Sequence, residues 1–153
     1  MRTYLVVIDE TPEAALALRF ATRRAAITGG TLEVLALVPR QEFVAWGGVQ
    51  ATMEQEAREH AEELVEVALG TVAAEAREQL HPSIRVRHGN PVDEVRATLS
   101  ENAEIAALVL GAAPSGAPGP LVSAFTGTEA GKLPCPVMII PGGLSDAALD
   151  RLC

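Results

Sequence analysis

Short apolar runs alternate with longer amphipathic stretches along this chain, and this alternation constrains the fold more than any other feature of the sequence. The candidate strands are residues 4–9, 32–38, 84–88, 106–110 and 137–140, and most of them are near-continuous apolar runs with β-branched residues. Such runs are typical of strands that are buried on both faces of a sheet. The alternation therefore predicts an α/β fold, a doubly wound parallel sheet with helices on both faces. We expect one domain over residues 1–153, in which 141–153 form a C-terminal tail.

Boundary signals locate the helices between these runs. Residues 11–12 and 90–91 each combine an N-cap residue with a proline, so helices should begin there. The first of these helices should end at the glycine pair 29–30. Apolar residues at helical spacing predict a long second helix over 53–72. We expect the last helix before the fifth strand between residues 127 and 133, and a short helix in the tail.

Charge and composition exclude several classes of function. The formal net charge of −8 argues against nucleic-acid binding, which needs clustered Lys and Arg. No apolar run approaches the roughly 18 residues of a membrane span, and the first run is too short for a signal peptide. The cysteines, Cys135 and Cys153, form neither a disulfide framework nor a metal-ligand spacing. We therefore expect a cytoplasmic protein with no metal site and with neither nucleic acid nor membrane as a partner.

Ligands of open parallel sheets bind beyond the carboxyl ends of the strands, where the strand order reverses. Two features fall there. Asp9 ends the first run. Three roles are open for its carboxylate: it faces a nucleotide, it stabilises a turn, or it binds a metal. Residues 111–131 follow the fourth run and contain five glycines and three prolines but only one charged residue. Glycine lets backbone N–H groups turn toward an anion, and Gly127-Thr128 stands where we expect a helix to start, but Gly and Pro also mark merely flexible loops.

Three longer segments resemble the universal stress protein family. They are YLVVIDETPEAALALRFA, HGNPVDEVRATLSENAEIAALVLGA and GTEAGKLPCPVMIIPG, and their order and spacing are those of the family over nearly the whole chain. The resemblance implies a five-stranded parallel sheet with strand order 3-2-1-4-5. The family's last strand often pairs with that of a second copy, which implies a homodimer. The strand that would pair here consists of Val137, Met138, Ile139 and Ile140.

Many members of this family bind ATP with a glycine, two residues, a glycine, nine residues and then Gly-Ser or Gly-Thr. Gly111 matches the first glycine and Gly127-Thr128 the final pair, but 15 residues separate Gly111 from Gly127 where the pattern has 12. Gly116 and Gly119 keep the two-residue gap, and seven residues then precede Gly127. The loop has the composition of the family's phosphate loop with altered spacing. The nucleotide-binding residues that the resemblance implies are Asp9, Thr11, Val38, Gly111, Gly116, Gly119, Gly127 and Thr128.

The function implied by this resemblance is binding of ATP or another adenine nucleotide, as a signalling or stress-response module, with Mg²⁺ as the candidate accompanying ion. Asp9 would then stand near ribose and adenine, Thr11 in the following turn, and Val38 against the adenine. Phe43 and Trp46 cover a base, form a subunit contact or pack locally. Because no nucleophile, base and orienting group can be assembled, we expect no catalytic residue and no enzyme activity. The alternative is a dimeric interaction protein of the same fold that has lost nucleotide binding.

Overall fold

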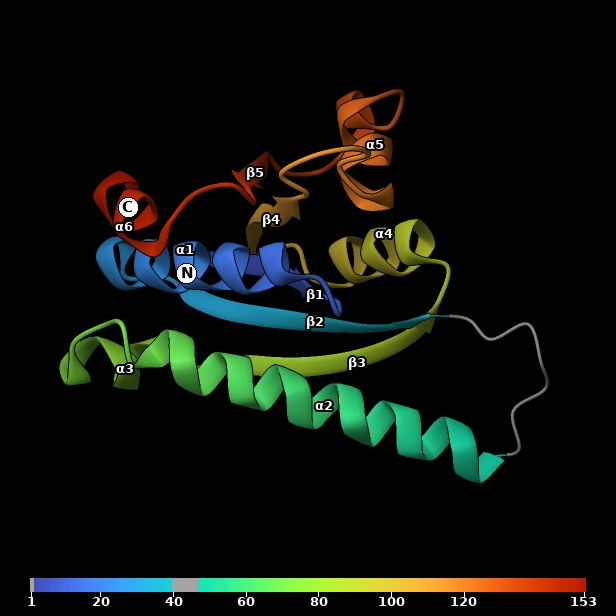
Figure 1. The fold of residues 1–153 in the computed structure, drawn as a ribbon, viewed down its shortest axis with the longest axis horizontal. Coiled ribbons are helices and arrows are strands. Elements are labelled where there is room, and N and C mark those ends of the chain that lie inside the picture. The colour runs from blue at the N-terminus through green and yellow to red at the C-terminus, as the bar shows by residue number, and fades with distance from the viewer. Residues whose placement is uncertain (1, 40–46) are drawn as a thin grey trace.

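The computed structural model describes residues 2–39 and 47–153 of the chain. Its five strands form one parallel sheet in the order β3-β2-β1-β4-β5 (Figure 1). They are β1 (Thr3–Ile8), β2 (Thr31–Pro39), β3 (Ser83–Gly89), β4 (Ile105–Ala112) and β5 (Val137–Pro141). The predicted fold class and strand order are confirmed. Phe43 and Trp46 lie outside the described residues.

The helices begin at the predicted signals in two places. They are α1 (Pro12–Thr28), α2 (Gly47–Leu69), α3 (Ala74–Leu80), α4 (Pro91–Glu101), α5 (Pro120–Thr126) and α6 (Asp146–Leu152), with a 3₁₀ turn η1 (Ala130–Lys132). Pro12 stands in the first turn of α1, and the Asn90 side chain caps α4 by accepting from the N–H of Asp93 at 3.1 Å. Gly29 ends α1 with φ of 71°, a left-handed conformation that favours glycine. In the part of the chain that the structure describes, no helix is long and apolar enough to cross a membrane.

Both faces of the sheet are buried, as the near-continuous apolar strands predict. Val6 on β1 stands opposite Val34 on β2 and Val109 on β4. With their neighbours they form one row across all five strands, in the order Ile84, Val34, Val6, Val109 and Met138. This row belongs to a first hydrophobic cluster that α1, α2, α3 and α6 cover. A second cluster fills the opposite face under α4 and α5.

The last helix before β5 begins earlier than the sequence predicts. We expected its start at Gly127-Thr128, whereas α5 occupies the preceding seven residues and Gly127 ends it. Residues 127–133 form only the short turn η1 and the segment around it. Pro120 suits the first turn of a helix, and α5 has an apolar face, whereas residues 127–133 offer Leu133 as their one large apolar residue. That apolar face, buried in the second cluster, consists of Leu121, Val122 and Phe125.

The tail forms the predicted short helix and docks on α1 (Figure 1). The Ser145 hydroxyl caps α6 by accepting from the N–H of Ala148 at 3.1 Å. Leu149 is fully buried in the first cluster. Beside it, Asp150 accepts two hydrogen bonds from the Arg19 guanidinium, at 2.9 and 2.7 Å. A buried leucine and a bidentate ion pair therefore fix α6 to the domain.

The two edges of the sheet differ in chemistry. On edge strand β3, Arg85 pairs with Glu101 of α4 at 2.7 Å, and Arg87 pairs with Glu101 and, at 3.4 Å, with Glu94. Charged side chains of this kind protect an edge from pairing with another chain. The opposite edge strand, β5, pairs with β4, and no other described strand pairs with it. Its half-buried side chains are apolar and consist of Val137, Met138 and Ile139.

Candidate functional site

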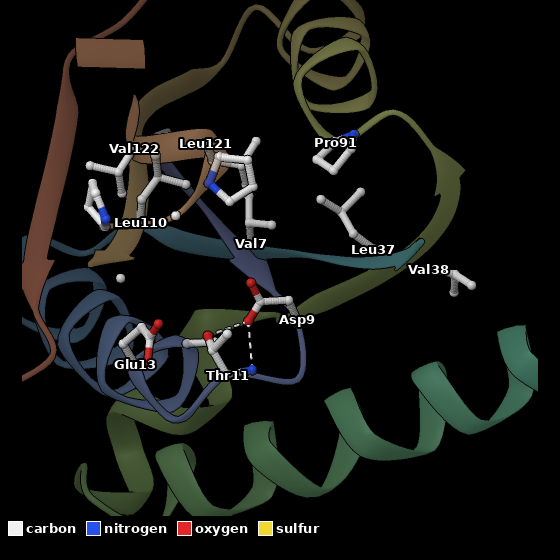
Figure 2. A pocket seen from close by; sticks show the side chains of 15 residues that line it. Val7, Asp9, Thr11, Glu13, Leu37, Val38, Pro91, Leu110, Leu121 and Val122 are labelled. Carbon is white, nitrogen blue, oxygen red and sulfur yellow. Dashed lines mark hydrogen bonds between the residues drawn. The ribbon is translucent and has the colours of Figure 1, made fainter. Parts of the chain in front are cut away.

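A cavity of about 240 Å³ opens at the carboxyl ends of β1 and β4 (Figure 2). From β1 the chain continues outward to β2 and β3, and from β4 it continues in the other direction to β5, so the strand order reverses between these two strands. The lining comes from the ends of β1, β2 and β4, from the first turns of α1 and α4, and from residues 118–122. The cavity therefore lies where ligands of doubly wound sheets bind.

Most of the wall is apolar. Val7 and Leu37 extend the second hydrophobic cluster to the cavity, and Leu110 continues it from β4. Leu121 and Val122 from the first turn of α5 close the wall opposite α1 (Figure 2). A cavity with apolar walls and a few polar groups is typical of small-molecule sites, and about 240 Å³ lies just below the roughly 300–1,000 Å³ of pockets for drug-sized ligands. Its size and surface suit one flat apolar ring system with a small polar attachment.

The main polar feature is the turn that follows β1. One oxygen of the Asp9 carboxylate accepts hydrogen bonds from the backbone N–H of Thr11, at 2.9 Å, and from the Thr11 hydroxyl. These bonds fix the carboxylate in an Asx-type turn. The other oxygen points away from Thr11 toward the apolar wall (Figure 2), and it accepts no hydrogen bond from any described residue. It is therefore available to a ligand that donates a hydroxyl or amine hydrogen.

A second carboxylate at the cavity, that of Glu13, was not predicted. Glu13 stands in the first turn of α1, four residues after Asp9. Its backbone lies very close to Gly111 of β4, because a Cβ built on Gly111 would be 2.3 Å from the Glu13 carbonyl oxygen. A Cβ on Gly142 would be 3.1 Å from the Cβ of Glu13. Gly111 therefore allows α1 to approach β4, and this close approach brings Glu13 to the cavity.

The structure brings five of the eight predicted site residues together. Asp9, Thr11, Val38, Gly111 and Gly119 line the cavity. The other three do not line it, and they are Gly116, Gly127 and Thr128.

The physical reason is the position of α5. Gly119 caps the start of α5 with φ of 119°, in the position that the sequence argument gave to Gly127. Gly127 ends the same helix, so Gly127 and Thr128 lie at the end of α5 that is away from the cavity. Gly116 has φ of 74° and open space around it, as expected of a turn glycine. The sequence also missed the apolar wall of Leu37, Leu110, Leu121 and Val122, because only the packing of α5 reveals it.

A second cavity, of about 310 Å³, lies on the α2 side of the same strand ends. It shares Asp9, Leu37 and Val38 with the first cavity. From α2 it adds Met53, Glu56 and His60. Its lining is more polar than that of the first cavity. Within residues 2–39 and 47–153, no group of three or more His, Cys, Asp or Glu side chains is arranged to hold a metal ion. A Mg²⁺ that accompanies a nucleotide would therefore depend on the phosphate oxygens for its ligands. Because its walls are the more apolar of the two, we regard the first cavity as the candidate site.

The fold agrees with the comparisons. A family model described as "Universal stress protein family" matches residues 1–141. Universal stress protein UspA from Lactobacillus plantarum is similar in structure, with a TM-score of 0.66 and 19% identity over 91% of this chain and 97% of that chain. No curated protein sequence gives a significant match.

Two further solved structures are similar to this chain. One is a universal stress protein in complex with cAMP, with a TM-score of 0.56 and 17% identity over 91% of this chain and 96% of that chain. The other is the universal stress protein from Archaeoglobus fulgidus in complex with dAMP, with a TM-score of 0.51 and 18% identity over 92% of this chain and 97% of that chain. At these identities the structures establish the fold. Because the family model spans nearly the whole chain, the chain belongs to the universal stress protein family.

Proposed function

We propose that this protein binds the adenosine part of an adenine nucleotide, such as ATP or AMP, in the cavity at the ends of β1 and β4. The observation that carries the proposal is an apolar cavity at the reversal of strand order with one available carboxylate oxygen, that of Asp9, beside it. The cAMP and dAMP complexes of two proteins with this fold support the choice of an adenine compound. In this role the protein is a signalling or stress-response module.

The chemistry of the cavity suits the two parts of a nucleoside. An adenine ring has apolar faces, which match the branched side chains of Val7, Leu37 and Leu121. Ribose hydroxyls and the adenine amino group are hydrogen-bond donors, and the Asp9 carboxylate is an acceptor. Because the Asx-type turn already orients Asp9, a ligand would bind without reordering this side chain.

We propose binding without catalysis. The lining described for the cavity contains no His, Lys, Arg or Cys, which leaves carboxylates and one threonine as its functional groups. A cytoplasmic location is part of the same proposal and rests on the cysteine argument, because Cys135 and Cys153 are both free thiols.

We also propose that two copies form a homodimer through β5. The support is the contrast between the sheet edges, since β3 carries paired charges whereas β5 presents apolar side chains next to unpaired backbone groups. An apolar edge of this kind needs a partner or a cover. Light scattering of the purified protein tests the proposal, and a monomer at all concentrations would contradict it.

Isothermal titration calorimetry tests the binding proposal. Adenosine, AMP and ATP should be titrated with and without Mg²⁺, and at least one should saturate. Asp9→Ala should weaken binding by about 1–3 kcal/mol, or roughly five- to 150-fold, because a hydrogen bond to a charged acceptor is lost. Glu104→Ala is the matched control, because this exposed acid precedes β4 at the opposite end of the sheet. Circular dichroism should show both variants folded.

One observation favours the alternative function, an interaction protein without a nucleotide. Gly127 and Thr128, the matches to the final pair of the family's phosphate loop, do not line the cavity. No heat with any of the three compounds at millimolar concentration would make the alternative the better interpretation.

A further inference from the structure

We propose that the cavity selects an uncharged adenine nucleoside over its triphosphate, so that adenosine is bound more tightly than ATP. This inference rests on the proposed function and concerns which member of the ligand class the site prefers. It follows from the charges at the cavity, from the loop where phosphates would be expected, and from the pairing of two arginines on neighbouring elements.

The charged groups that line the cavity are all acidic. They are Asp9 and Glu13, and the lining that the structure describes includes no Lys, Arg or His. Neither carboxylate forms an ion pair with a described residue. A triphosphate at this site would bring about four negative charges next to two unneutralised carboxylates, and like charges disfavour one another most at short range and low salt.

The backbone of Glu13 has little freedom to move away from such a ligand. Its carbonyl oxygen lies against Gly111, and its Cβ lies close to Gly142 of the tail. The N–H of Gly142 in turn donates to the carbonyl of Ala112 at 2.8 Å, which holds the tail against β4. The first turn of α1 is therefore held between β4 and the tail, and the acidic residue remains at the cavity.

The loop after β4 lacks several of the donors that could offset this charge. Residues 114, 118 and 120 are prolines and have no N–H. The N–H of Ala113 already donates to the carbonyl of Pro118 at 3.1 Å, and that of Ser123 donates to the carbonyl of Gly119 at 3.0 Å. Pro120, in the first turn of the seven-residue α5, removes one of the N–H groups that an anion at this helix start would use. Gly127 and Thr128, which the sequence argument placed at a helix start, lie at the end of α5.

Two arginines on neighbouring elements are paired with acids. Arg87 of β3 pairs with Glu94 and Glu101. Arg96 of α4 pairs with Glu129 at 2.8 Å. Each would have to leave a carboxylate to meet a phosphate, and that carboxylate would then lose its partner. The described part of the molecule therefore provides an adenosine site without a positive counterpart for phosphates.

Affinity measured against ionic strength gives the decisive test. Adenosine, AMP and ATP are titrated into the full chain, without divalent ions, at about 0.01 M and about 0.15 M salt, where the Debye length is about 30 and about 8 Å. At low salt, ATP should bind at least about tenfold more weakly than adenosine, with AMP between them. Salt should strengthen ATP binding, because it screens repulsion, and should leave adenosine binding unchanged. A phosphate cradle predicts the opposite sign, since salt weakens an attraction between opposite charges.

A charge-neutralising variant supplies an independent readout. Glu13→Gln should reduce the adenosine-to-ATP affinity ratio by about threefold or more, because one of the two repelling charges is removed. Glu78→Gln removes the same charge from the exposed surface of α3 and should leave the ratio as in the parent. ATP binding tighter than adenosine, or weakened by salt, would overturn the inference and leave the proposed function standing. No binding of any of the three compounds would overturn both.

Discussion

Replacing Gly111 with alanine should destabilise the fold, because the added Cβ has no room. Built on the observed backbone, this Cβ would lie 2.3 Å from the carbonyl oxygen of Glu13 and 2.7 Å from its carbonyl carbon. Cβ atoms essentially never approach other heavy atoms within 3.0 Å. The first turn of α1 and β4 must therefore separate by about 0.7 Å, the difference between the two distances.

Neither element can make this movement freely. The α1 side is fixed by Ala14, which is 3% exposed, and β4 is hydrogen-bonded to strands on both sides. Overpacking of this kind costs about 1–3 kcal/mol. Because the free energy of unfolding of a domain is about 5–15 kcal/mol, the loss should be easily measured.

Gly131→Ala is the matched control for Gly111→Ala. A Cβ at Gly131 meets no atom within 4 Å, and its backbone is not in the left-handed region. The alanine should therefore be neutral or stabilise by up to about 1 kcal/mol, since it restricts the unfolded chain. Urea unfolding followed by circular dichroism measures both variants, with equal m-values as the check on two-state behaviour. Two variants within about 0.5 kcal/mol of each other would refute the close approach of α1 to β4.

Three further predictions concern the tail and the β5 edge. Leu149→Ala should lower the free energy of unfolding by about 2–5 kcal/mol in urea titrations, because a fully buried leucine leaves a cavity. The hydrogen bond from Arg19 lowers the pKa of Asp150. The pair therefore stabilises the fold at a pH above the ordinary carboxyl pKa of about 3.9, and this stabilisation is lost as the pH falls through the lowered pKa. Urea midpoints should therefore fall less steeply with acidification in Asp150→Asn than in the parent. Ile139→Lys should give a monomer in light scattering with unchanged far-UV circular dichroism, whereas a stable dimer would move the interface away from β5.

The sequence predicted the sheet well because its signals are local and redundant. Most strands are apolar runs bounded by turn residues, and the resemblance to a known family implied the order of the strands. Asp9 and Thr11 line the cavity because they directly follow β1, whose end lies at the reversal of strand order. The location of such residues in the fold can be predicted once the end of one strand is known.

The remaining parts of the site depend on tertiary packing and were therefore missed or misplaced. Gly127-Thr128 matched a motif by composition, but the start of α5 is set by the burial of Phe125, which is 1% exposed, in the second cluster. A count of residues between glycines contains no information on that burial. Glu13 comes to the cavity only because Gly111 lets α1 lie close to β4. From the sequence alone, Glu13 is one residue in the first turn of a helix, and only the packing of α1 against β4 places it at the cavity.

The docking of α6 shows that the family match and the packed core of this domain end at different residues, although the two boundaries are usually taken as one. The family match ends at residue 141, whereas the first hydrophobic cluster continues to Leu149 and is closed by the pair between Arg19 and Asp150. Sequence families record which residues relatives share, but cooperative unfolding follows the packed core. The amide hydrogens of α6 should therefore exchange with solvent as slowly as those of α1, and not at the faster rate of a fraying helix end. A chain cut after residue 141 would lose part of its hydrophobic core.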